Sequence, residues 1–236
     1  MSSPTLVEHA REFGIELSPM QLDAFETYYR ELVAWNARFN LTTITERNQV
    51  IVKHFLDSLS SAPLLRPNVA SLIDIGSGAG FPGVPLKIAL PSLRVTLLDP
   101  TGKKVEFLKH VIAALDLRGA TALHARAEEL AHDPAHREKY DAAVARAVAD
   151  LATLLEYALP FVRIGGVCVA YKGVEVEEEV RRAARATIGL GGRLSEVMPV
   201  QLPGLERRHL IVVEKIAATP GKYPRAAGAP KKKPIA

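Results

Sequence analysis

The densest group of residues that could do chemistry is the run from Asp74 to Gly83, which reads Asp-Ile-Gly-Ser-Gly-Ala-Gly-Phe-Pro-Gly. It follows an apolar segment typical of a strand and precedes a helical pattern. Glycines in such a loop let the backbone turn tightly and approach a ligand more closely than residues with a Cβ atom can. Asp99 ends the next apolar segment, 23 residues after Gly76, where a carboxylate can accept both hydroxyls of a ribose. These features predict a nucleotide-type ligand.

Two cofactor classes fit this loop at first sight. Its last three glycines match the dinucleotide pattern Gly-x-Gly-x-x-Gly, but Pro82 and Pro85 remove backbone donors near the turn that would hold a pyrophosphate. An acidic residue two positions before Gly-x-Gly-x-Gly instead resembles motif I of the S-adenosylmethionine-dependent methyltransferases. The run from Asp74 to Gly80 fits that motif without a gap, and Asp99 suits either cofactor.

Two further segments follow predicted strands and could reach the same site. Arg126-Ala127-Glu128-Glu129 lies where methyltransferases usually contact the adenine, although its two glutamates also suit a solvated helix start. Ala145-Arg146-Ala147 lacks the Asn/Asp-Pro-Pro-aromatic run of enzymes that methylate exocyclic base amines, which disfavours that reaction. Cys168 is the only cysteine, so an internal disulfide and a thiolate metal site are excluded, and we expect no metal.

Short apolar runs that alternate with helical segments predict an α/β fold with a mostly parallel, doubly wound sheet. The last two apolar runs, joined by Pro203-Gly204, predict a C-terminal antiparallel hairpin. The predicted strands cover residues 69–76, 94–99, 121–125, 140–145, 165–171, 193–202 and 208–216, and the predicted helices cover 103–115, 151–159 and 174–188.

The first 66 residues predict a helical extension packed on this core. Ser18-Pro19-Met20-Gln21 offers a capping box with proline at the first helical position, and apolar residues at helical spacing follow it. A second helix is expected from Glu46 to Ser61, with Pro63 as its stop. We therefore divide the chain into residues 1–66, a Rossmann-like domain over 67–216, and a C-terminal arm over 217–236.

The net charge of +4 is concentrated at the C-terminus. Residues 217–236 hold five basic and no acidic residues, which leaves 25 basic and 26 acidic residues in the rest of the chain. Because this proline-rich segment has few apolar residues, we expect an extended arm that either contacts phosphates or only aids solubility. The first residues have no apolar leader, and no apolar stretch reaches the roughly 18 residues of a membrane span. We expect a cytoplasmic monomer.

The chain as a whole resembles the bacterial small-subunit ribosomal RNA guanine-N7 methyltransferases, also called glucose-inhibited division protein B. The resemblance runs from about Leu17 to the C-terminus. It is carried by Asn40-Leu41-Thr42, His54-Phe55-Leu56-Asp57-Ser58, the loop Asp74 to Gly83, Asp99 with Lys103-Lys104, Ala145-Arg146-Ala147, Lys172-Gly173 and Arg207-Arg208-His209-Leu210.

The resemblance implies a Rossmann-like enzyme that uses S-adenosylmethionine to methylate N7 of a guanine in 16S ribosomal RNA, either as RNA or within a pre-assembled small subunit. The implied cofactor residues are Asp74, Gly76, Gly78, Gly80, Phe81, Asp99, Pro100, Thr101, Ala127, Glu128 and Arg146. Guanine N7 carries a free lone pair, so we expect no acid–base catalyst, only positioning by Asn40, Arg146 and Lys172. The expected RNA contacts are Arg126, Lys172, Arg208 and His209.

Other interpretations remain open on the residues alone. The fold could serve a methyltransferase for a small molecule, because fold does not fix substrate. A non-catalytic RNA-binding module with a vestigial loop and an NAD-dependent oxidoreductase are less compatible with the intact motif. His54 could be a structural histidine bonded to a neighbour such as Asp57, and Trp35 and Phe39 could be core residues that stack on no base.

Overall fold

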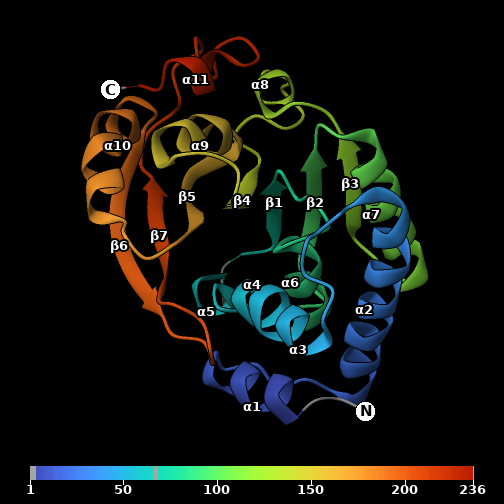
Figure 1. Ribbon diagram of the computed structural model, residues 1–236. Coiled ribbons are helices and arrows are strands. Elements are labelled where there is room, and N and C mark those ends of the chain that lie inside the picture. The colour runs from blue at the N-terminus through green and yellow to red at the C-terminus, as the bar shows by residue number, and fades with distance from the viewer. Residues whose placement is uncertain (1–3, 66–68, 236) are drawn as a thin grey trace.

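The computed structural model describes residues 4–65 and 69–235, which form one seven-stranded sheet with helices on both faces (Figure 1). The strand order is β3-β2-β1-β4-β5-β7-β6. Only β7 runs antiparallel to its neighbours β5 and β6, and all other neighbours pair in parallel. The strands are β1 (Ser71–Ile75), β2 (Arg94–Asp99), β3 (Ala120–His124), β4 (Tyr140–Arg146), β5 (Val162–Lys172), β6 (Gly192–Val200) and β7 (Arg208–Lys215). The predicted parallel sheet and C-terminal hairpin are confirmed.

Two apolar cores lie on opposite faces of the sheet because neighbouring strand residues point to opposite sides. Leu72 and Leu97 belong to one core, while their neighbours Ile73 and Leu98 belong to the other. Helices α1 to α7 cover the first core, and α8 to α10 cover the second. After α5 the helices are α6 (Gly83–Ala89), α7 (Gly102–Ala114), α8 (Ala127–Leu130), α9 (Leu151–Ala158), the short η2 (Leu159–Phe161), α10 (Glu177–Gly189) and α11 (Ala229–Lys232). In the described ranges, no helix is long and apolar enough to cross a membrane.

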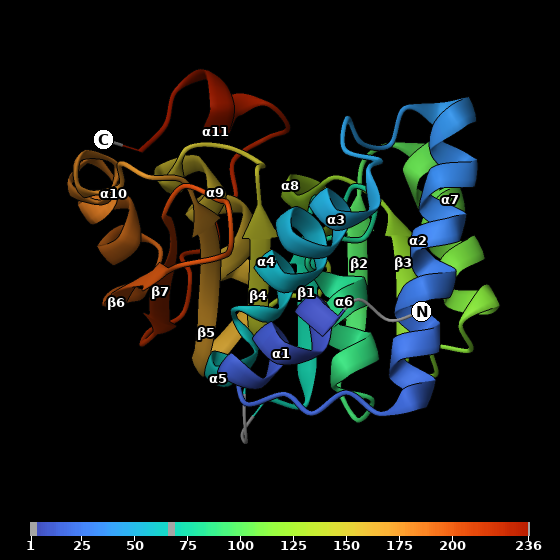
Figure 2. The same ribbon diagram turned by 60° about the horizontal axis from the view of Figure 1, so that its bottom comes forward.

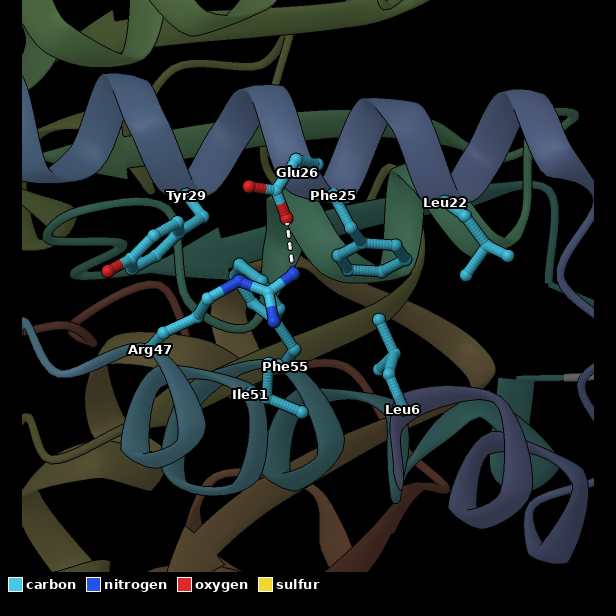
Figure 3. Close-up of a pocket in the computed structure, with 8 residues that line it drawn as sticks. All are labelled: Leu6, Leu22, Phe25, Glu26, Tyr29, Arg47, Ile51 and Phe55. Carbon is cyan, nitrogen blue, oxygen red and sulfur yellow. Dashed lines mark hydrogen bonds and ion pairs between the residues drawn. The ribbon is translucent and has the colours of Figure 1, made fainter. Parts of the chain in front are cut away.

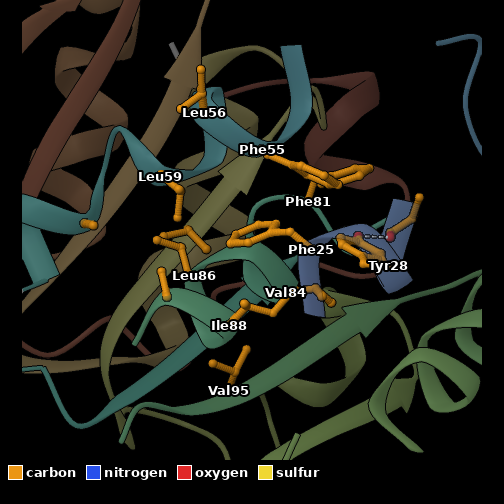
Figure 4. Close-up of a cluster of buried hydrophobic side chains, with 14 of the residues drawn as sticks. Phe25, Tyr28, Phe55, Leu56, Leu59, Phe81, Val84, Leu86, Ile88 and Val95 are labelled. Carbon is orange, nitrogen blue, oxygen red and sulfur yellow. Dashed lines mark hydrogen bonds between the residues drawn. The ribbon is translucent and has the colours of Figure 1, made fainter. Parts of the chain in front are cut away.

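The N-terminal helices pack directly on the glycine loop. Ser18 caps α2 with the predicted capping box, and the buried face of α2 carries Phe25 and Tyr28. These rings meet Phe55 and Phe81 in one apolar cluster (Figure 4). The helices of this part are α1 (Pro4–Glu12), α2 (Pro19–Phe39), α3 (Arg47–Val50), η1 (Ile51–Leu56), α4 (Asp57–Leu59) and α5 (Ala62–Leu65).

The second predicted helix differs from expectation in one respect. It is not continuous α-helix from Glu46 to Ser61, because a π-helical stretch, η1, separates α3 from α4. The helix ends before Pro63, as expected, and Pro63 itself lies in the short α5. An ion pair of 2.6 Å joins Arg47 of α3 to Glu26 of α2, and Figure 3 shows it beside residues of η1. The expected boundary between residues 66 and 67 lies outside the described residues.

The C-terminal segment is not the extended arm that its composition predicts. It folds back over α8 and α9 and includes the short α11, with Pro230 buried (Figure 2). The Arg225 guanidinium binds both carboxylate oxygens of Glu156, which is fully buried. Arg137 donates hydrogen bonds to the carbonyl oxygens of Thr219 and Tyr223. The segment has few apolar side chains to bury, but these polar contacts hold it in place.

Candidate functional site

The glycine loop leaves the carboxyl end of β1 in a conformation that requires glycine. Gly76, Gly78 and Gly80 have φ angles of +68°, +60° and +101°, a region that L-residues with a side chain rarely adopt. A Cβ atom on Gly76 would lie 2.9 Å from Val148 Cγ2, and one on Gly80 would lie 2.7 Å from the Tyr28 hydroxyl oxygen. Tyr28 also donates a hydrogen bond to the carbonyl oxygen of Ala79 at 2.5 Å. The N-terminal extension therefore holds the loop from one side.

Asp74 lies fully buried beneath this loop with one carboxylate oxygen unpaired. Its Oδ2 accepts a hydrogen bond from the backbone N–H of Gly83 at 2.9 Å, whereas Oδ1 has no partner among the described residues. Burial raises the pKa of Asp74 to about 7, against the lowering effect of the Gly83 N–H. An unpaired buried acceptor is costly unless a ligand supplies a donor. Asp74 is thus prepared for a ligand that carries N–H or O–H groups.

Asp99 connects the end of β2 to the same loop. Its Oδ2 accepts from the Gly78 N–H at 2.9 Å and its Oδ1 from the Thr101 N–H at 2.8 Å. Lys104 Nζ lies 3.9 Å from Oδ2. Since a carboxylate oxygen has two lone pairs, each still has room for one hydroxyl donor. The carboxylate is held in place by the backbone and can accept a ribose diol.

A pocket beside these aspartates brings four predicted cofactor residues together. Gly76, Pro100, Ala127 and Glu128 line it, along with Ile75, Leu98, Ala125, Arg126, Val148 and Tyr157. Most of these walls are apolar, so the pocket suits a planar heterocycle. The Glu128 Oε1 atom accepts a hydrogen bond from the Gly228 N–H at 2.9 Å, which the sequence did not predict. We call this cavity the cofactor pocket.

Seven predicted cofactor residues do not line the cofactor pocket, and two of these, Phe81 and Arg146, contact the N-terminal helices instead. The Phe81 ring stacks on His54 at a centroid distance of 4.3 Å, and the guanidinium carbon of Arg146 lies 5.1 Å from the Phe81 centroid. Phe81 is buried and supports the loop from the side of the N-terminal helices. Contact of either residue with a cofactor stays a prediction.

Arg146 is held by partners from η1 and α4. Its Nη1 donates to Asp57 Oδ2 at 2.7 Å and to the Lys53 carbonyl oxygen at 2.9 Å, and its Nη2 lies 3.3 Å from His54 Nδ1. Thr42 Oγ1 lies 3.0 Å from His54 Nε2. Burial and the Arg146 charge lower the pKa of His54 to about 3, so the imidazole is neutral. Both ring nitrogens of His54 contact protein atoms, which favours the structural interpretation, but Asp57 pairs with Arg146 and not with His54.

A second pocket lies on the other side of the β4 end and brings three predicted RNA contacts together. Asp57, Arg146, Ala147, Tyr171, Lys172, Gly173, Arg208 and His209 line it, with a volume of about 250 Å³. Ala147 has a φ of +57°, a strained conformation for alanine, between Arg146 in this pocket and Val148 in the cofactor pocket. We call this second pocket the substrate pocket.

The basic side chains of the substrate pocket differ in whether they already have hydrogen-bond partners within the protein. Lys172 Nζ is already bonded to Glu179 Oε1 at 2.6 Å and to the Ala149 carbonyl oxygen at 2.7 Å. His209 Nδ1 lies 2.9 Å from the Gly173 carbonyl oxygen. Within the described ranges, Arg208 has no hydrogen bond or ion pair from its guanidinium.

Two predicted site residues lie elsewhere. Arg126 is exposed at the rim of the cofactor pocket and not in the substrate pocket. Asn40 ends α2 with a φ of +48° and is exposed, and it lines neither pocket. The sequence analysis gave no role to Thr42 and did not predict that Asp57 pairs with Arg146, although both Thr42 and Asp57 lie within motifs that carried the resemblance.

Comparison with known proteins decides which interpretation holds. The GidB family, described as rRNA small subunit methyltransferase G, matches residues 21–211. The chain belongs to this family. Its relatives include the "Ribosomal RNA small subunit methyltransferase G" of Roseiflexus castenholzii, 52% identical over 230 residues that cover 98% of each chain. The protein of the same name from Acetivibrio thermocellus is 47% identical and covers 98% of this chain and 95% of its own.

Solved structures show the same fold at low sequence identity. The precorrin-6y C5,15-methyltransferase of Geobacter metallireducens has a TM-score of 0.52 at 15% identity, covering 75% of this chain and 91% of that chain. TrmN of Thermus thermophilus has a TM-score of 0.52 at 20% identity, covering 70% and 53%. As a GidB family member, this chain is a methyltransferase with a Rossmann-like fold that uses S-adenosylmethionine. The interpretation that the glycine loop binds a dinucleotide is therefore rejected.

The residues present fit S-adenosylmethionine. Its α-ammonium group would supply a donor for the Oδ1 atom of Asp74, which has no partner among the described residues. Its ribose hydroxyls match the free lone pairs of Asp99, and its adenine matches the apolar walls of the cofactor pocket. These individual contacts stay predictions.

Proposed function

We propose that this protein transfers the methyl group of S-adenosylmethionine to N7 of a guanine in 16S ribosomal RNA. The observation that supports this most is the pair of pockets on either side of the β4 end. The cofactor pocket adjoins the glycine loop, and the substrate pocket is lined by Arg146, Lys172, Arg208 and His209. Relatives about half identical over nearly their whole length are named for the small ribosomal subunit.

The chemistry requires positioning more than proton transfer. When bound, the cofactor supplies an electrophilic methyl group on its sulfonium sulfur. Guanine N7 would attack this methyl carbon with its in-plane lone pair, and the carbon–sulfur bond would break to leave a neutral thioether. No base has to remove a proton first. His54 is a poor proton acceptor, because its pKa of about 3 makes it a weak base and both of its ring nitrogens already have partners, which agrees with a site that works without a general base. Alignment alone can lower a barrier by about 7–11 kcal/mol in favourable models.

Arg146 is placed to position the guanine without opposing the reaction. N7 methylation leaves the base cationic, and an uncompensated cation nearby would disfavour that product. The Asp57 carboxylate, 2.7 Å from Arg146 Nη1, neutralises the guanidinium. Its other N–H groups can donate to O6, the guanine acceptor next to N7 that arginine commonly recognises. This keeps the N7 lone pair free for the methyl group.

Transfer of a labelled methyl group tests the proposal. The purified protein and labelled S-adenosylmethionine are incubated in three separate reactions. These contain deproteinised ribosomal RNA, isolated small subunits or a metabolite extract. We expect label in small-subunit RNA as N7-methylguanosine. The variant Gly78→Asp serves as the control, since its carboxylate would occupy the ligand side of the loop and prevent cofactor binding. Label only in a small molecule would contradict the RNA assignment.

A further inference from the structure

The C-terminal segment is fixed against the wall of the cofactor pocket. Glu128, which lines that pocket, accepts the hydrogen bond of the Gly228 N–H. Three residues earlier, Arg225 is bound to the buried Glu156, and two residues later Pro230 is buried. Figures 1 and 2 show α11 beside α8 and α9, at the end of the sheet toward which the strands β1, β2 and β3 point. This segment therefore lies beside the active site.

A run of lysines follows these anchors directly. Lys231, Lys232 and Lys233 are exposed, and in the described part of the chain none of them forms an ion pair. Consecutive Cα atoms are 3.8 Å apart, so the Cα atom of Lys231 lies within about 11 Å of that of Gly228. Three positive charges are thus carried close to the cofactor pocket.

The neighbouring helix α10 adds further positive charge. Arg182 and Arg185 line a groove whose other side is formed by Pro234 and Ile235, directly after the lysine run. Arg185 has no ion pair within residues 4–65 and 69–235, and Arg182 has only a 3.9 Å contact with Glu178. We define Arg182, Arg185, Lys231, Lys232 and Lys233 as the C-terminal basic surface.

Within the described ranges, the acidic residues of the same groove form no ion pair with this surface. The Asp150 carboxylate accepts hydrogen bonds from Thr153 at the start of α9. The Glu179 carboxylate binds Lys172 and the Leu151 N–H. The remainder of the chain carries 25 basic and 26 acidic residues before position 217, so the positive charge is local and not general.

We propose that the C-terminal basic surface binds phosphates of the substrate RNA next to the target guanine. This inference rests on the proposed function and deepens it. Among the described residues, all cations of this surface except Arg182 lack an acidic partner. Clustered free cations bind a polyanion by releasing its counterions, and such contacts carry no sequence information. The surface adds affinity for RNA, while the substrate pocket selects the base.

The triple variant Lys231→Gln, Lys232→Gln, Lys233→Gln tests this role in the full-length protein. We expect RNA affinity to fall about tenfold at physiological salt. The slope of log affinity against log salt should become less steep by about 2, because each of the three lost phosphate contacts contributes about 0.7 to the slope on single strands. Affinity for S-adenosylmethionine, measured by calorimetry without RNA, should not change. The KM for RNA should rise while kcat at saturating RNA stays near that of the wild type.

A matched control removes three charges near the amino ends of the strands, at the end of the sheet away from the cofactor pocket. Arg94, Arg118 and Lys139 are exposed near the amino ends of β2, β3 and β4. Changing these three residues to glutamine should leave RNA affinity nearly unchanged. An equal loss in both triple variants, or wild-type affinity and salt slope in the lysine variant, would overturn the inference. If the wild-type protein methylates no ribosomal RNA, the proposed function itself fails and this inference fails with it.

Discussion

At the scale of single residues, the Asp57–Arg146 pair shows how a buried charge is used. Both side chains are largely buried, with 4% and 15% exposure. Removing one partner of a buried pair leaves an uncompensated charge and costs about 3–5 kcal/mol. We therefore expect Asp57→Asn to lower the free energy of unfolding by about 3 kcal/mol, as measured in urea. Because Arg146 would lose its fixed position, kcat should fall while the affinity for S-adenosylmethionine stays unchanged.

The exposed pair of Arg193 and Glu214 provides the control for that prediction. Arg193→Met should change stability by less than about 1 kcal/mol, since exposed ion pairs contribute little. If Asp57→Asn weakened cofactor binding as much as it slowed turnover, the positioning role of this pair would be wrong.

Asp74 leads to a pH prediction with a definite sign. Its pKa is about 7 in the folded protein, whereas the ordinary value of 3.8 applies to the unfolded chain, so between these two values the unfolded chain holds fewer protons than the folded protein. Stability from the neutral acid is present at low pH and is lost as the pH rises from about 4 to 7. The melting temperature of the cofactor-free protein, relative to that of Asp74→Asn, should therefore fall between pH 5 and pH 7.5. A constant difference between the two proteins over this range would contradict the burial of an ionisable Asp74.

At the scale of elements, the C-terminal segment completes the cofactor pocket through the short helix α8. Arg225→Met removes the partner of the fully buried Glu156 and loosens the nearby Gly228–Glu128 contact. We expect a lower melting temperature and a dissociation constant for S-adenosylmethionine that is higher by about tenfold, or about 1.4 kcal/mol. The double variant Arg225→Met, Glu156→Met removes both charges and should recover much of the stability. Unchanged cofactor affinity in Arg225→Met would show that the segment does not support the pocket.

At the scale of the whole molecule, the structural features that could be predicted from the sequence are those that depend on residues close together in the chain. The glycines of the loop, the capping box at Ser18 and the strand periodicity each act over a few neighbours, and all three are found in the structure. The docking of the C-terminal segment depends on Glu156 and Arg225, which are 69 residues apart and whose pairing no local pattern reveals. The Asp57–Arg146 pair, 89 residues apart, was missed for the same reason, although both residues lie in motifs that had been noticed.

The same long-range contacts predict that the N-terminal helices and the sheet unfold together. Tyr28 binds the Ala79 carbonyl oxygen in the glycine loop, and the buried hydroxyl of Tyr171 in β5 donates to the Ser58 carbonyl oxygen at 2.7 Å. Because one apolar core is shared by α2, η1 and β1, neither part can keep its buried surface without the other. Calorimetry should therefore give one transition with equal calorimetric and van't Hoff enthalpies, and saturating S-adenosylmethionine should shift it upward as a whole. Tyr171→Phe should lower that single transition without splitting it. Two separate transitions, or a cooperative melt of residues 67–236 produced alone, would mean that the extension is an independent domain.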